Sequence, residues 1–167
     1  MNSKYSSKKL ALLAMSIALA MILSFVESQI PSFVAVPGVK VGLANIVVIF
    51  ALYRLGAKEA IIISIIRVLL VSLLFGNMMS LWYSLAGAVL SFIGMIIMKK
   101  CKVFSYIAVS VAGGVLHNMG QIGMACLVLE TDIIKYYAPF LVLSGVIAGV
   151  VTGLAASIMI KRIDVKV

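Results

Sequence analysis

Long apolar runs separated by short polar connectors fill almost the whole chain. A helix of about 20 apolar residues crosses a bilayer, so runs of this length predict membrane-spanning helices rather than strands. Six spans are predicted at about 10–26, 43–55, 57–75, 81–98, 104–129 and 137–160, with an outer loop at 27–42. The pattern therefore predicts a single domain, 1–167, folded as an all-α integral membrane bundle of six transmembrane helices.

The composition agrees with a membrane protein and leaves no room for a separate catalytic domain. Of the 167 residues, 64% are hydrophobic and 11% are charged, whereas a soluble domain averages about 45–50% apolar and about 25% charged residues. Six spans leave only short connectors, too short for a soluble domain of even about 50 residues. Any function must reside within the bundle.

The net charge of +9 reflects orientation in the membrane rather than nucleic-acid binding, and no nucleic-acid partner is expected. With an even number of spans, both termini share one side with the connectors at 54–58 and 99–102. The basic residues of that side are Lys4, Lys8, Lys9, Arg54, Lys58, Lys99, Lys100, Lys102, Lys161, Arg162 and Lys166. Only Lys40 and Lys135 lie on the other side, so both termini are predicted to be cytoplasmic.

Arg67 is a basic residue within a predicted span, about ten residues into the run 57–75. There an arginine costs about 2.5–3.5 kcal/mol on insertion scales and is normally paired or faces an aqueous cavity. Two explanations stay open. Arg67 either anchors an anionic substrate or pairs with Glu27, Glu130 or Asp132, or it bonds backbone carbonyls or extends its charged end to the membrane surface.

A polar stripe is predicted on the span 104–129. His117 and Gln121 are four residues apart and Asn118 lies three before Gln121, so one helix face carries all three and must point inward. The stripe either lines a pocket or forms hydrogen bonds between helices, which are worth about 0.6 kcal/mol on average. One His cannot supply the three or four ligands of a zinc site, and no nucleophile is paired with a base. No catalytic residue, metal or cofactor is therefore predicted, and the protein is not expected to be an enzyme.

The outer loop 27–42 and the residues just after it are rich in proline and glycine. Non-helical backbone near membrane depth is tolerated only where protein or a water-filled cavity covers it, so this loop predicts a cap over an outward-facing site. Trp82 and Tyr83 either complete this cap or belong to an interfacial aromatic belt. The candidate substrate-binding residues are Glu27, Lys40, Asn45, Arg67, Asn77, His117, Asn118 and Gln121.

Small residues spaced four apart predict where helices approach one another closely. Gly145, Gly149 and Gly153 form such a face on the last span, and are predicted to pack within the bundle. Ala14 and Ala18 form a second face on the first span, near the predicted cytoplasmic surface. This second face would suit the docking of another membrane subunit.

The motif P-G-V-K-V-G-L-A-N-I-V at 37–47, the preceding E-S-Q-I-P at 27–31 and the six-span length resemble a bacterial family, heptaprenyl diphosphate synthase component I, also called the Gx transporter family. That family is similar to the substrate-binding S components of energy-coupling factor (ECF) transporters, six-helix proteins that capture a micronutrient outside the cell. The resemblance implies an S-component-like bundle in the bacterial cytoplasmic membrane. It also implies a small-molecule ligand of unknown identity, a separate transmembrane coupling protein and two ATPase subunits. In S components an A-xxx-A motif in the first helix docks the coupling protein, and Ala14 and Ala18 match that motif.

The two family names imply different functions. A prenyl synthase needs Mg²⁺ held by clustered carboxylates, whereas the aspartates of this chain are Asp132 and Asp164, predicted on opposite sides of the membrane. The chain also lacks the ATP-binding motif G-xxxx-GK-[ST], so any ATPase is a separate protein. The sequence thus favours an S component for a micronutrient or related metabolite. The alternatives are a non-catalytic membrane subunit associated with a polyprenyl (heptaprenyl) diphosphate synthase, and a solo channel or secondary transporter.

Overall fold

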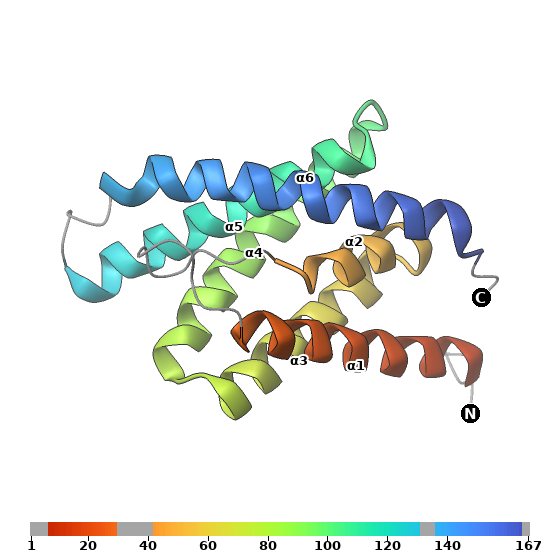
Figure 1. Cartoon of the computed structure of the whole chain (residues 1–167), viewed down its shortest axis with the longest axis horizontal. Helices are drawn as coiled ribbons and strands as arrows, with labels where there is room; N and C mark the ends of the chain where they lie inside the picture. Colours follow the sequence, from red (N-terminus) through yellow and green to blue (C-terminus); the bar gives the residue numbers. More distant parts are fainter. Residues whose placement is uncertain (1–6, 30–41, 131–135, 165–167) are drawn as a thin grey trace.

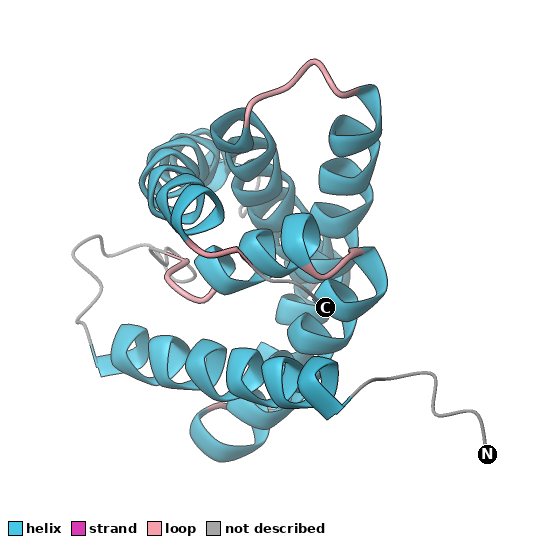
Figure 2. Ribbon diagram, turned by 90° about the vertical axis from the view of Figure 1, so that its right-hand side faces the viewer, coloured by secondary structure: helices cyan, strands magenta, loops and turns pink. Residues whose placement is uncertain are grey.

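A computed structural model of the chain describes residues 7–29, 42–130 and 136–164. These residues form helices joined by short loops, with no strand among them (Figure 2). The helix bounds lie within three residues of the predicted ones. The helices are α1 (Ser7–Gln29), α2 (Asn45–Arg54), α3 (Ala57–Phe75), α4 (Met78–Cys101), α5 (Tyr106–Leu129) and α6 (Ala138–Arg162).

Four of the helices, α1, α4, α5 and α6, are long and apolar enough to cross a membrane. Helix α3 has 19 residues but carries Lys58, Glu59 and Arg67. Helix α2 has ten residues, and at about 1.5 Å per residue it extends only about 15 Å, half of a hydrocarbon core of about 30 Å. The predicted span 43–55 thus forms a helix that is too short to cross a bilayer by itself.

The start of α1, the end of α6 and the α2–α3 and α4–α5 connectors lie at one end of the molecule (Figure 1). We call this the basic end, because its described residues include Lys8, Lys9, Arg54, Lys58, Lys99, Lys100, Lys102, Lys161 and Arg162. The end of α1, the α3–α4 turn, the end of α5 and the start of α6 lie at the opposite end, called here the loop end. The arrangement of helix ends is the one that the alternation of spans predicts.

Helix α2 lies between α1 and α6 in the middle of the molecule (Figure 1). Its residues 47–52 are all buried, which explains why a short apolar helix forms here without any side-chain cap. Helix α1 packs on α2 and α3 only, among the helices described, while α4, α5 and α6 form a second closely packed group. The fold therefore consists of two halves, α1–α3 and α4–α6, which meet through α2 and through the α3–α4 contact.

The glycines of α6 bring its backbone against that of α5. A Cβ atom on Gly149 would lie 2.5 Å from the Cα of Val111, and one on Gly145 would lie 3.0 Å from the backbone of Gly114. A Cβ atom on Gly153 would meet a side chain of α5 at 2.8 Å. The predicted packing of this small-residue face within the bundle is confirmed.

Polar contacts at the basic end join the two halves. Arg54 at the end of α2 donates from Nε to the carbonyl of Ile160 in α6 over 3.1 Å, and pairs with Asp164 at 3.3 Å. Lys99 of α4 donates to the carbonyl of Leu52. These bonds satisfy carbonyl groups in the last turns of α2 and α6, which have no partners inside their own helices.

Candidate functional site

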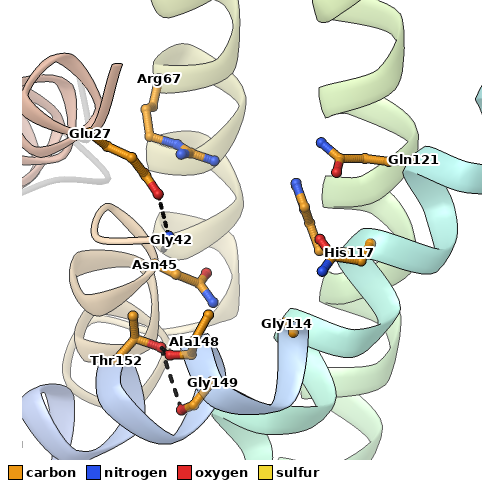
Figure 3. Close-up of a pocket in the computed structure, with 12 residues that line it drawn as sticks. Glu27, Gly42, Asn45, Arg67, Gly114, His117, Gln121, Ala148, Gly149 and Thr152 are labelled. Atoms are coloured by element: carbon orange, nitrogen blue, oxygen red, sulfur yellow. Dashed lines mark hydrogen bonds between the residues drawn. The ribbon is translucent and has the colours of Figure 1, made fainter. Parts of the chain in front are cut away.

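A polar cavity lies between the α1–α3 half and helices α5 and α6. It consists of two adjoining lobes of about 80 and 200 Å³. Glu27, Arg67, His117 and Gln121 line both lobes. The smaller lobe extends toward α6 and the start of α2 (Figure 3), and the larger one extends between α1, α3 and α4. The cavity therefore combines side chains from every helix of the bundle.

Arg67 comes from the middle of α3 and its guanidinium points into the cavity (Figure 3). Its Nη1 lies 3.4 Å from Oγ of Ser24, to which it donates a long hydrogen bond. Its Nε is buried and has no hydrogen-bond partner among the described residues. Buried polar groups in folded proteins nearly always have partners, and in membranes such groups commonly mark substrate pathways. Arg67 thus faces a cavity, and its role in substrate binding stays a prediction.

Glu27 lies in the last turn of α1 and lines both lobes of the cavity together with Arg67. Its Oε1 accepts a hydrogen bond from the backbone N–H of Gly42, drawn as a dashed line in Figure 3. Gly42 has a φ of +75°, in the left-handed region that glycine adopts without strain. The end of α1 is therefore joined to the residues that lead into α2, with the carboxylate at the cavity. Of the other acids proposed for Arg67, Glu130 is exposed at the end of α5, and Asp132 lies outside the described residues.

The predicted polar stripe of α5 divides into two kinds of residue. His117 and Gln121 point into the cavity from the wall opposite Arg67 (Figure 3), and Oε1 of Gln121 is buried without a hydrogen-bond partner among the described residues. Asn118 also lines the cavity, but its Nδ2 donates to the Leu141 carbonyl at 2.6 Å and to Ser144 at 3.2 Å. The stripe therefore both lines a cavity and ties α5 to α6, so each of the two explanations describes part of it.

The remaining candidates are Asn45, Asn77 and Lys40, and of these the structure places Asn45 at the cavity. Asn45, the first residue of α2, lines the smaller lobe. Asn77 does not line either lobe, because it is the exposed cap of α4: its Oδ1 accepts the N–H of Ser80 at 2.8 Å, and Oγ of Ser80 accepts the N–H of Asn77. The structure gives Asn77 this capping role instead of the predicted place in the cavity. The signal was present in the sequence, since a cap residue with a polar residue at the third helical position forms a capping box. Lys40 lies outside the described residues.

The surface candidates lie away from the cavity. Trp82 is 50% exposed and lines an apolar groove between α4 and α5. Tyr83 is half-buried and is not among the residues that line the two lobes. Ala14 and Ala18 are both exposed on α1, on a face that no other described helix covers.

Several small hydroxyl residues of the cavity have no counterpart in the sequence-based prediction. They come from α1, α3, α4 and α6 and are Ser24, Ser28, Ser72, Ser80, Ser84 and Thr152. Serine and threonine are frequent on membrane helices and form ordinary interhelical contacts, so single residues of these types carry little information. The spacing of Ser24 three residues before Glu27 places both on one face of α1, and is the one signal that could have identified Ser24.

Comparison with known protein families identifies the chain. The family model for heptaprenyl diphosphate synthase component I matches residues 16–159. The chain belongs to this family. No curated protein and no solved structure matches the chain significantly. The stretch shared with the heptaprenyl diphosphate synthase component I family contains all the described residues that line the polar cavity.

Proposed function

We propose that this protein is the membrane-embedded substrate-binding (S) component of an ECF-type uptake transporter, with a small micronutrient or related metabolite as ligand. The observation that carries the proposal is the polar cavity inside a bundle whose surface is mostly apolar. Burying a polar group without a partner costs free energy, and both Arg67 and Gln121 present such atoms to the cavity. A bound polar ligand would supply the missing partners, and no catalytic group is needed for this function.

The charge pattern supports one orientation in the bacterial cytoplasmic membrane. Lys and Arg residues collect on the cytoplasmic side of membrane proteins, so the basic end faces the cytoplasm and both termini lie there. The loop end then faces outward, and so does the cavity, since Glu27 and Gly42 lie where α1 ends and the path to α2 resumes. In this orientation all six helices contribute spans. Helix α3 crosses with Arg67 turned inward, and the ten-residue α2 crosses part of the way.

A transport cycle follows from this arrangement. The ligand binds from outside; most of the predicted cap, the loop 27–42, lies outside the described residues. The bundle then changes its orientation against a transmembrane coupling protein, and ATP hydrolysis by two separate ATPase subunits drives release inside. Ala14 and Ala18 are proposed as the docking face for the coupling protein, because both are exposed and their small side chains allow close approach of a second helix.

Native mass spectrometry of the full chain, gently extracted from its own host, tests the proposal. One spectrum reports bound small molecules and bound subunits together. We expect a small polar ligand, and a complex with a coupling protein and ATPases. The ligand should be absent from Arg67→Ala and present in the matched variant Arg162→Ala, which removes an exposed arginine at the basic end. Protein without ligand and without these subunits in repeated preparations would disprove the proposal.

A second function is favoured by the family description, which names a component of heptaprenyl diphosphate synthase. The protein would then be a non-catalytic membrane subunit that anchors a polyprenyl synthase, and the cationic side chains of the basic end would suit a diphosphate. This function predicts that a soluble prenyl synthase copurifies with the chain, and that its rate or product length changes when the chain is removed. Copurification of ATPases in place of a prenyl synthase would support the transporter function.

A further inference from the structure

The formal charges of the described residues that line the cavity balance one another. Among these residues the acid is Glu27 and the permanently cationic side chain is Arg67, and both line the two lobes. The charges of this pair sum to zero. Inside a membrane bundle an uncompensated charge is expensive, because the surroundings have a low dielectric constant. A ligand with a net charge would leave one charge without compensation, whereas a net-neutral ligand preserves the balance.

The unpartnered atoms define what the ligand must present. Nε of Arg67 is a hydrogen-bond donor, and Oε1 of Gln121 is an acceptor. The two side chains extend toward one another from α3 and α5, on opposite walls of the cavity (Figure 3). A ligand between them therefore needs an acceptor at the end that faces Arg67 and a donor at the end that faces Gln121.

The size of the cavity limits the ligand to a small molecule. The two lobes, of about 80 and 200 Å³, hold roughly twenty to thirty waters if each needs about 10–15 Å³. This is room for a ligand of on the order of twenty to thirty non-hydrogen atoms at most. Five serine hydroxyls line the larger lobe beside the apolar side chains of Val68, Val71 and Phe75, so a ligand there meets both hydrogen-bonding and apolar partners.

We propose that the cavity selects a small, net-neutral polar molecule, uncharged or zwitterionic, that places a carbonyl or carboxylate oxygen on Arg67 and an N–H group on Gln121. This inference rests on the proposed substrate-binding function and specifies the ligand class for it. It replaces the simpler expectation that an arginine inside a span selects an anion, because Glu27, with the opposite charge, lines the same two lobes as Arg67.

The test uses the full chain in detergent and a metabolite extract of the host, separated by ion exchange at pH 7 into anionic, cationic and net-neutral fractions. The readout is the shift in thermal unfolding temperature that each fraction causes. We expect the neutral fraction to stabilise the protein and the charged fractions to have no effect. For Gln121→Ala, the same shift should need at least about tenfold more of the neutral fraction, because a ligand N–H loses its acceptor.

Charge-altering variants make the test independent of ligand identity. Glu27→Gln leaves the cavity with a net positive charge and keeps an oxygen for the Gly42 N–H, so the stabilising fraction should become the anionic one. Gln121→Glu leaves a net negative charge, and should shift the preference to the cationic fraction. Glu130→Gln is the matched control, since it makes the same chemical change at an exposed residue, and it should keep the neutral preference.

The outcomes separate this inference from the proposed function. Stabilisation of the unaltered protein by the anionic or the cationic fraction would overturn the neutral-ligand inference, while the substrate-binding function would stand. A preference that stays unchanged in both charge variants would also overturn it. If no fraction stabilises the unaltered protein, the substrate-binding function fails as well.

Discussion

Gly42 donates its backbone N–H to the carboxylate of Glu27, fifteen residues earlier in the chain. The bond fixes the residues that lead into α2 against the last turn of α1, at the edge of the polar cavity (Figure 3). Glu27 therefore contributes to the cavity in two ways: its Oε1 accepts the Gly42 N–H, and its carboxylate lines the same two lobes as the oppositely charged Arg67. A substitution at Gly42 should therefore affect the surroundings of Arg67, and a substitution at Arg67 should affect those of Gly42.

Gly42→Ala should destabilise the protein through backbone strain. Gly42 has a φ of +75°, and no atom of the described residues lies within 4 Å of the position that a Cβ atom would take. The cost is therefore conformational rather than steric, about 1–2 kcal/mol for an L-residue in the left-handed region. Thermal or chemical unfolding in detergent measures it. Gly123 also has open space at its Cβ position, but it is helical, so Gly123→Ala should be neutral or stabilising by about 0.5–1 kcal/mol. Equal losses in both variants would contradict this explanation.

Arg67→Ala should remove the ligand without unfolding the protein. Among the described residues, Arg67 makes one long side-chain hydrogen bond, to Ser24, so few contacts of the fold depend on its guanidinium, while a ligand would lose a charged donor. We expect ligand occupancy in native mass spectra to fall at least about tenfold. Size-exclusion chromatography should still show a monodisperse peak. An aggregated variant would mean instead that Arg67 serves the fold.

Gly149→Leu should weaken the contact between α5 and α6. A side chain at Gly149 points at the backbone of Val111, which cannot move aside as a flexible side chain would. Overpacking of this kind costs about 1–3 kcal/mol or more, to be measured by unfolding in detergent. Gly123→Leu on α5 adds the same bulk where there is open space, and should cost much less. A similar loss in the two variants would show that added bulk alone is responsible.

The ion pair between Lys9 and Glu59 should stabilise the contact of α1 with α3. Lys9 Nζ lies 2.6 Å from Oε1 of Glu59, whose side chain is only 7% exposed. Lys9→Ala leaves a buried carboxylate without this cation, and should cost about 1–3 kcal/mol. The double variant Lys9→Ala/Glu59→Ala removes the buried charge as well, so it should be less destabilised than the sum of the two single variants. Strict additivity in this double-mutant cycle would rule out a direct coupling.

Ala14→Leu/Ala18→Leu should abolish uptake in cells and leave ligand occupancy unchanged. Both alanines are exposed, so larger side chains there are tolerated by the fold but prevent close approach of a partner helix. Radiolabelled uptake, once the ligand is known, and native mass spectrometry of the same membranes give the two readouts. Gly123→Leu serves as the control for added bulk on another exposed helix surface. Uptake at the unaltered rate would remove the docking proposal.

The sequence predicted the helices well because the bilayer makes hydropathy and length directly informative. It also identified Arg67, His117 and Gln121, since polar side chains inside apolar runs must face the interior. The second predicted span, 43–55, is short for a structural reason. Helix α2 is enclosed by α1, α3 and α6, so it buries its apolar residues without the length of a membrane-spanning helix.

Other parts of the site could not be predicted, because they depend on which partner a side chain meets. Asn118 lies on the same stripe as Gln121. Its amide forms a hydrogen bond with α6 only because the Leu141 carbonyl lies within reach, and the sequence does not reveal that position. Ser72 and Ser84 become cavity residues through the packing of α3 and α4, which no local pattern encodes. Asn77 is the opposite case. Its capping box with Ser80 can be recognised from the local sequence, whereas its place in an outer connector favours the interpretation as a binding residue.

The bonds from Arg54 to Ile160 and Asp164 also have a consequence for biosynthesis. Most helix contacts join neighbours in the sequence, so they form as the chain leaves the ribosome, whereas these bonds span 106 and 110 residues. A nascent chain interrupted before Ile160 lacks both the Ile160 carbonyl and the Asp164 carboxylate that Arg54 binds, and of these contacts at the basic end it retains the one from Lys99 to the Leu52 carbonyl. Synthesis of α6 also supplies one wall of the polar cavity, since Gly145, Ala148, Gly149 and Thr152 line its smaller lobe, so a product truncated before Gly145 lacks that wall.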